Sequence, residues 1–188
     1  MNRRRLLQTF AASLLVPAGF AGAQFVRKPA ASQVPSIEAL QRDWKKLLAP
    51  NAPVAHDLTP IVKTDAEWRR ALDAKAYDVL RHEATERPFS SPLNDEHRPG
   101  AFVCAGCALP LFTSAMKFDS GTGWPSYFTT IPGVFKTKSD HLMIVERTEY
   151  HCAKCGGHHG HVFDDGPAPT GLRYCNNGVT LRFIPADV

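Results

Sequence analysis

Two pairs of closely spaced cysteines constrain the fold of this chain more than any other feature. Cys104 and Cys107 form one CxxC motif, Cys152 and Cys155 form a second, and 44 residues separate the two. Four thiolates suit the tetrahedral coordination of zinc, and two intervening residues allow a tight turn to direct both sulfurs of a pair at one ion. A four-cysteine site has no open position, so we predict one structural zinc ion per chain. Two structural disulfides are the alternative in an oxidising compartment.

Residues 1–23 have the pattern of an export signal. Arg3–Arg5 precede an uncharged, mostly apolar stretch that ends in Ala21-Gly22-Ala23, which has the small residues typical of a cleavage site. The stretch is short and contains Pro17, whereas a membrane-spanning helix needs ~20 apolar residues. We therefore expect no stable membrane anchor and a mature protein that starts near Gln24. An uncleaved amphipathic anchor is the alternative.

The arginines also indicate a route of export. Arg3-Arg4 followed by Leu6-Leu7 resembles the twin-arginine signal, whose pathway exports folded proteins. This route predicts a periplasmic location and allows zinc to be loaded in the reducing cytoplasm before export.

Composition narrows the class of protein. Of 188 residues, 44% are hydrophobic and 21% charged, which excludes wholesale disorder. The formal net charge is +4, but residues 1–23 hold three of the arginines and no acid, so the rest is close to neutral. A near-neutral body argues against a nucleic-acid partner. The 15 prolines and 13 glycines favour a loop-rich, sheet-based fold.

The N-terminal half predicts a few helices. Within an extension or linker over residues 24–60, apolar residues recur at helical spacing over 37–48, with Ser36 as the N-cap. Thr64 and Glu67 have capping-box spacing at the start of a second helix. Its inner stripe is predicted to contain Trp68, Ala71 and Leu72, and a further helical piece covers residues 77–82.

After Pro88 the pattern changes to short apolar runs separated by Gly, Pro and Asp, which predicts strands. The clearest covers residues 179–184. There Val179, Leu181 and Phe183 would face one way, and Thr180 and Arg182 the other. Residues 142–145 form a second, more continuously buried run. We place the main domain at 61–188.

The fifth cysteine, Cys175, is left over from the zinc site. Arg173 and Asn177 lie two residues to either side, so in an extended chain all three side chains share a face. A nearby cation stabilises a thiolate and a carboxamide can hold an oxygen, which are requirements of a reactive nucleophile. Four of the eight histidines fall within residues 151–161. A buried, inert Cys175 is the alternative, and so is a second metal on His158 and His161, although these two lack an obvious third ligand.

Several stretches together resemble the B-type methionine-R-sulfoxide reductases. They occur in the family's order from about Trp68 to Phe183. The matching stretches are the two CxxC motifs, Thr85-Glu86-Arg87-Pro88-Phe89, Phe118-Asp119-Ser120-Gly121-Thr122-Gly123-Trp124-Pro125-Ser126, Gly160-His161-Val162-Phe163-Asp164-Asp165-Gly166-Pro167 and Arg173-Tyr174-Cys175-x-Asn177.

The resemblance implies a mainly β (α+β) fold: two antiparallel sheets in a compact domain, a few N-terminal helices, and a zinc remote from the active site. It implies that Cys175 attacks the sulfoxide sulfur and becomes a sulfenic acid. The resemblance implies that His161, His158 and Asn177 bind or protonate the sulfoxide oxygen. It implies that Trp124 and Phe163 contact the substrate, and that Arg173 and Asp165 orient the imidazoles and the cysteine.

The chain departs from the family pattern at two places. Thr122 stands where many members have a resolving cysteine, so regeneration is expected from an external thiol such as a thioredoxin-like reductant. Asn176 and Gly178 replace the apolar and small hydroxyl residues common beside Asn177. The expected substrates are proteins or peptides that contain methionine sulfoxide. A zinc-ribbon-like binding module and a purely structural secreted zinc protein are the competing hypotheses.

Overall fold

Short helices precede the strands, and their N-caps follow the sequence. The computed structural model describes residues 35–140 and 147–187. The helices are α1 (Ile37–Asp43), α2 (Asp65–Ala71) and α3 (Ala74–His82), with a 3-10 turn over Trp44–Leu47 after α1. Ser36 caps α1 by accepting a hydrogen bond from Ala39 N at 3.2 Å. The predicted capping box of Thr64 and Glu67 is present at α2, and Asp73 caps α3.

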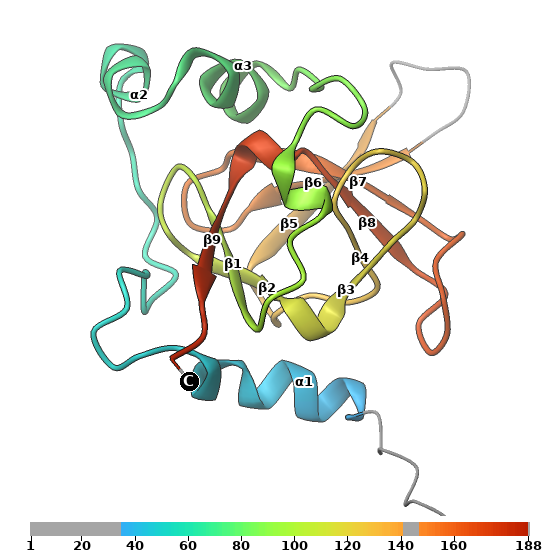
Figure 1. Cartoon of the computed structure of the whole chain (residues 1–188). Helices are drawn as coiled ribbons and strands as arrows, with labels where there is room; N and C mark the ends of the chain where they lie inside the picture. The colour runs from blue at the N-terminus through green and yellow to red at the C-terminus, as the bar shows by residue number, and fades with distance from the viewer. Residues whose placement is uncertain (1–34, 141–146, 188) are drawn as a thin grey trace, which may run out of the picture. The chain divides into compact units, whose positions relative to one another are not determined.

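Two antiparallel sheets make up the body of the fold (Figure 1). One has the strand order β2-β1-β9, and the other the order β3-β4-β8-β7-β6-β5. The strands are β1 (Gly100–Cys104), β2 (Pro110–Thr113), β3 (Lys117–Phe118), β4 (Ser126–Tyr127), β5 (Phe135–Asp140), β6 (Arg147–Cys152), β7 (His158–Phe163), β8 (Arg173–Asn176) and β9 (Leu181–Pro185). The predicted fold class, mainly β with two antiparallel sheets and a few helices, is confirmed.

The core contains aromatic residues from both sheets. Phe102 of β1, Phe112 of β2, Tyr127 of β4 and Tyr150 of β6 are fully buried. The rings of Phe112 and Tyr127 stack at a centroid distance of 3.8 Å and so join the two sheets. α3 packs against β7 and contributes Leu80 to this core.

Some sequence predictions need correction, and two others lie outside the described residues. Ala71 is exposed, because α2 ends there and Leu72 already has extended backbone. The predicted strand over 179–184 begins only at Leu181, since Gly178–Thr180 form a 3-10 turn. Thr180 is fully buried instead of facing outward, because its hydroxyl donates to Asn177 O at 2.7 Å. The predicted strand over 142–145 and the signal over 1–23 fall outside the described residues.

The N-terminal segment from residue 35 onward contacts the body at several points. Gln41 Nε2 donates to Thr129 Oγ1 at 2.9 Å, and Ala55 N donates to Ala108 O at 2.9 Å. Among the described residues, no helix combines the length and apolar character needed to cross a membrane.

Candidate active site and metal centre

A row of opposed side chains crosses the six-stranded sheet. His161 of β7 lies opposite Cys175 of β8, Glu149 of β6 lies opposite His161, and Lys138 of β5 lies opposite Glu149. Directly opposed residues of antiparallel strands project from the same face. The register therefore brings the leftover cysteine and a histidine together, although 14 positions separate them in the chain.

A pocket of about 140 Å³ opens beside Cys175. Of the predicted site residues, Cys175, His161, Asn177, Trp124 and Phe163 line it. Its other lining residues are Thr85, Arg147, Gly160 and Asn176. The volume suits a small polar group with a short apolar arm.

The predicted residue His158 lies behind this pocket. Its ring centroid is 5.5 Å from that of His161, and the side chain is 1% exposed. A bulge in the pairing of β6 with β7 allows His158 and His161 to approach each other although they are three residues apart. Burial lowers the pKa of His158 to about 4, so its imidazole is neutral at neutral pH. Its Nδ1 contacts Glu149 Oε1, a buried carboxylate that the sequence analysis did not single out.

Arg173 and Asp165 form a bidentate ion pair. Arg173 Nε and Nη2 donate to the two carboxylate oxygens of Asp165 at 2.7 and 2.8 Å. The guanidinium also lies over the ring of Phe163, at 4.3 Å from its centroid. Asp165 therefore fixes the position of the Arg173 guanidinium.

Two opposing effects act on the Cys175 thiol. Burial raises its pKa above the ordinary value, while Arg173 and a hydrogen bond from the Thr122 side chain lower it. Burial dominates, so the resting cysteine carries its proton at neutral pH. The predicted help from Arg173 is present, but the structure does not hold a preformed thiolate.

Thr122 touches the sulfur from the neighbouring loop. Ser126 of β4 lies opposite Cys175, and its hydroxyl is 2.8 Å from that of Ser120. Ser120 in turn is 2.8 Å from the Thr122 hydroxyl. A chain of hydroxyls therefore holds Thr122 against Cys175. Thr122 occupies the position at which the family resemblance places a resolving cysteine in many members.

Glu86 connects two walls of the pocket and was missed by the sequence analysis. Its backbone N donates to Asn177 Oδ1 at 3.0 Å, and its carbonyl accepts from Trp124 Nε1 at 3.2 Å. Its carboxylate accepts hydrogen bonds from the backbone N of Gly178 and of Val179. Asn177 Nδ2 also donates to His159 O at 3.0 Å. The available signal was that Glu86 belongs to one of the stretches that resemble the reductase family.

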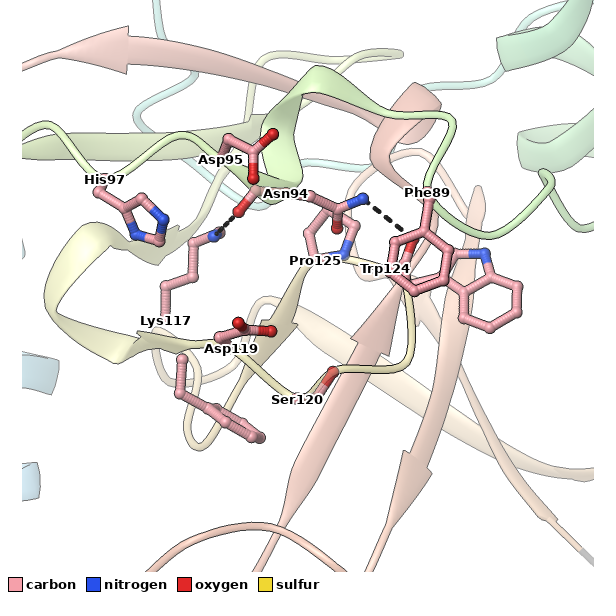
Figure 2. Close-up of a pocket in the computed structure, with 11 residues that line it drawn as sticks. Phe89, Asn94, Asp95, His97, Lys117, Asp119, Ser120, Trp124 and Pro125 are labelled. Carbon is pink, nitrogen blue, oxygen red and sulfur yellow. Dashed lines mark hydrogen bonds between the residues drawn. The ribbon is translucent and has the colours of Figure 1, made fainter.

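A second pocket, also about 140 Å³, lies beside the Trp124 loop and shares only Trp124 with the first (Figure 2). Phe89 N donates to Gly123 O at 2.7 Å, and Asn94 Nδ2 donates to the same oxygen at 3.0 Å. Lys117 Nζ donates to Asn94 O at 2.6 Å. These bonds fix the loop that carries Trp124, while the Phe89 ring remains 73% exposed at the rim.

The four remaining cysteines form a separate cluster that shares no residue with the Cys175 pocket. All four are free thiols, and their sulfurs lie within 4.8 Å of one another. Cys104 Sγ is 3.6 Å from Cys155 Sγ, and Cys107 Sγ is 3.5 Å from Cys152 Sγ. A tetrahedral ion with bonds of ~2.3 Å to sulfur separates its ligands by ~3.8 Å, whereas a disulfide needs ~2 Å. The four thiols are therefore arranged to hold a metal ion, which would join β1 of one sheet to β6 of the other.

Comparisons with known proteins agree with this geometry. A family model described as the SelR domain matches residues 72–185, which include the pocket and all four clustered cysteines. The chain belongs to the SelR-domain family. Its pocket around Cys175 is thus the candidate active site of a family of peptide methionine sulfoxide reductases.

The match between this SelR-domain chain and two relatives extends over most of the length of each relative. The peptide methionine sulfoxide reductase MsrB of Herminiimonas arsenicoxydans is 56% identical over 124 residues, which are 65% of this chain and 90% of the relative. The MsrB protein of Agrobacterium fabrum is 50% identical over 132 residues, 69% of this chain and 98% of the relative. Membership makes the chain an oxidoreductase that acts on methionine sulfoxide, and it disfavours the zinc-ribbon and purely structural hypotheses.

Proposed function

We propose that this SelR-domain protein reduces the R epimer of methionine sulfoxide in oxidised proteins or peptides, with Cys175 as the nucleophile. The observation that carries the proposal is the direct opposition of Cys175 and His161 at the wall of a pocket that also contains Trp124. A thiol, a proton-transferring group and an apolar surface are the groups needed to attack a sulfoxide sulfur and hold its methyl group.

The first half of the reaction balances with a neutral thiol. Cys175 Sγ attacks the sulfoxide sulfur, the sulfur–oxygen bond breaks, and the oxygen ends on cysteine as a sulfenic acid. The substrate sulfur gains the two electrons that Cys175 loses, and the thiol proton remains in the sulfenic acid. A raised resting pKa of Cys175 is therefore compatible with the chemistry.

Each wall of the pocket supports one part of this step. His161 lies directly opposite Cys175 in the strand register and is assigned proton transfer to the leaving oxygen, with His158 behind it and Asn177 at the pocket edge. Trp124 and Phe163 would contact the methyl group. Arg173, held by Asp165, supports Cys175 electrostatically.

The second half needs an external reductant. Thr122 contacts Cys175 but offers no thiol, and the other four cysteines belong to the metal cluster. Two external thiols therefore reduce the sulfenic acid, through a mixed disulfide and with release of water. A thioredoxin-like protein is the proposed partner.

The two epimers of a blocked methionine sulfoxide, each incubated with the protein and dithiothreitol, test the proposal. We expect methionine from the R epimer alone, and none from Cys175→Ser, because a hydroxyl is a far poorer nucleophile. Circular dichroism of Cys175→Ser and of Cys175→Ala should match that of the wild type, which would show that the loss of activity does not come from unfolding. Cys107→Ser is not a suitable control, because it damages the metal cluster. Turnover by Cys175→Ser, or a preference for the S epimer, would refute the assignment.

The regeneration step has its own test. After one equivalent of substrate and no reductant, mass spectrometry with a sulfenic-acid trap should find the label on Cys175. Excess oxidant should convert it to the irreversible sulfinic form. A disulfide between Cys175 and another cysteine of the same chain would contradict external regeneration.

We also propose that the ion in the four-cysteine cluster is zinc. The cluster offers four thiolates at separations that suit a tetrahedral ion and has no place for a substrate. Bound zinc would hold β1 and the β6–β7 turn together and take no part in the reaction.

We propose that the protein acts in the periplasm after twin-arginine export. Support comes from Arg3-Arg4 and the short apolar stretch of residues 1–23. Arg3→Lys with Arg4→Lys should retain the protein in the cytoplasm in cell fractionation. Unchanged periplasmic recovery would contradict this route.

A further inference from the structure

A second cluster of metal-ligating side chains lies on the same sheet face as the pocket. Glu149 and His151 are two residues apart on β6 and so project from one face, and His158 of β7 lies opposite His151. One ligand atom from each lies within 4.8 Å of the other two. His151 Nε2 is 3.2 Å from Glu149 Oε1, and His158 Nδ1 contacts the same oxygen.

Three ring nitrogens of this cluster are buried, and Glu149 Oε1 lies beside two of them. Within residues 35–140 and 147–187, His158 Nδ1, His158 Nε2 and His151 Nε2 make no hydrogen bond of normal geometry, and Nε2 of His158 has no polar contact at all among these residues. His158 is 1% exposed, so water does not reach its ring freely. Leaving buried polar atoms unpaired is costly. One nitrogen from each imidazole and one carboxylate oxygen lie within 4.8 Å of one another, which is an arrangement that a bound cation satisfies.

We propose that Glu149, His151 and His158 form a second metal site, which takes a divalent first-row transition ion such as Zn²⁺. Two imidazoles and one glutamate are a known protein ligand set for zinc, with the fourth position left to water. The sequence suggested His158 and His161 as ligands and found no third. The structure instead supplies Glu149 and His151 to His158.

Lys138 engages one of the two carboxylate oxygens of Glu149. Lys138 Nζ is 3.1 Å from Glu149 Oε2, the other carboxylate oxygen, and is also paired with Glu83 Oε1 at 2.6 Å. Oε1 of Glu149 is therefore the oxygen that faces the imidazoles. The side chain of His151 is 16% exposed, which provides a route from solvent to an otherwise buried site.

Occupation of this site would inhibit the reductase. A metal bound to His158 takes up the nitrogen electron pair and places positive charge next to His161, whose ring centroid is 5.5 Å away. Proton transfer to the sulfoxide oxygen then loses its second imidazole. This consequence rests on the proposed function, whereas the metal site itself does not.

Cobalt binding tests the site independently of activity. Protein with its four-cysteine metal in place and Cys175→Ser, to exclude that thiol as a ligand, is titrated with Co²⁺. We expect one additional equivalent, with a visible spectrum that lacks thiolate charge-transfer bands. His151→Ala should weaken cobalt binding at least about tenfold, because loss of a residue that only hydrogen-bonds to a metal ligand already lowers metal affinity by about that factor. Exposed His56→Ala is the matched control and should bind as before. Glu149→Gln provides a second ligand variant.

The inhibition is measured in a single turnover without added thiol, because thiols compete for zinc. Zn²⁺ should suppress methionine release by the wild type and leave His151→Ala active at the same concentration. Without added zinc, His151→Ala should be as active as the wild type. The site would be overturned if no additional cobalt binds, or if His151→Ala and Glu149→Gln bind cobalt as tightly as the protein that keeps these residues. Equal inhibition of wild type and His151→Ala would overturn its regulatory effect. Failure of the wild type to release methionine in the absence of added zinc, with its four-cysteine metal in place, would count against the proposed function alone.

Discussion

The backbone N of Glu86 donates to Asn177 Oδ1 at 3.0 Å, across 91 positions of sequence. The same residue accepts from the Trp124 indole and binds two backbone N–H groups after Asn177 with its carboxylate. One residue of the segment before the first strand thus fixes two walls of the candidate active site.

Replacement of the Glu86 side chain should therefore impair the site through the backbone of Gly178 and Val179, which follows Asn177. Glu86→Ala leaves the N–H groups of Gly178 and Val179 unpaired, and an unsatisfied buried group costs about 1–3 kcal/mol. We expect a lower unfolding free energy and a kcat/KM for the R epimer reduced by about tenfold, which corresponds to 1.4 kcal/mol.

Glu86→Gln distinguishes positioning from general destabilisation. Its amide oxygen can still accept one of the two hydrogen bonds, so it should recover part of the lost activity. Steady-state kinetics and denaturant unfolding of both variants measure the effect. Wild-type kcat and KM in Glu86→Ala would show that Glu86 does not position the pocket.

A cysteine at position 122 should change how the enzyme is regenerated. The Thr122 side chain contacts the Cys175 thiol, so a thiol there would lie within reach of the sulfenic acid. After one equivalent of substrate, we expect Thr122→Cys to form a disulfide with Cys175 and the wild type to form none. Non-reducing peptide mapping measures this. Thr122→Ser is the control, and absence of the disulfide in Thr122→Cys would place residue 122 too far from the sulfur.

Buried His159 should make the protein less stable in acid. Its side chain is fully buried, and burial lowers its pKa from 6.5 to about 3. The unfolded chain then binds a proton that the native state does not, so stability falls as pH decreases from about 6.5 towards 3. Each such group contributes a slope of up to about 1.4 kcal/mol per pH unit.

His159→Leu removes one of these groups and keeps a similar volume. His158, whose pKa is lowered to about 4, remains in both proteins. The unfolding free energy, measured by denaturant from pH 7 to pH 4, should fall less steeply in the variant. Parallel profiles of the two proteins would mean that His159 is protonated in the folded state.

Removal of the metal from the four-cysteine cluster should unfold the domain. Binding of structural zinc is worth ~10–16 kcal/mol in zinc-finger peptides, which exceeds the stability of most domains. We expect about one zinc per chain, and loss of cooperative thermal unfolding after treatment with a chelator and a reductant. Added zinc should restore the transition. Metal analysis without zinc, together with two disulfides among these cysteines, would contradict the assignment.

Local patterns in the sequence were sufficient for several parts of the fold. The caps at Ser36 and Thr64 depend on contacts within four residues, and both are present. The two CxxC motifs each need only one tight turn, so their spacing pointed to a shared ion before any pairing of strands was known. The strand expected from Val179 begins only at Leu181, because Thr180 is turned inward by hydrogen bonds. Two of its partners, Asn176 and Asn177, are close in the chain, and the third, His159, is 21 positions away. A period-two pattern encodes none of these contacts.

The order of amino acids along the chain specifies which chemical groups are available: a fifth cysteine, a group of histidines, four further thiols, and stretches similar to a reductase family. Tertiary structure alone decided which of these groups meet. His161 faces Cys175, Glu149 faces His158, and Glu86 binds Asn177 because of strand register and chain crossings over tens of residues. Such contacts follow from the register of neighbouring strands and from the path of the segment before β1, and spacing along the chain carries no information about either. The burial that raises the pKa of the Cys175 thiol likewise arises only when the sheets are packed.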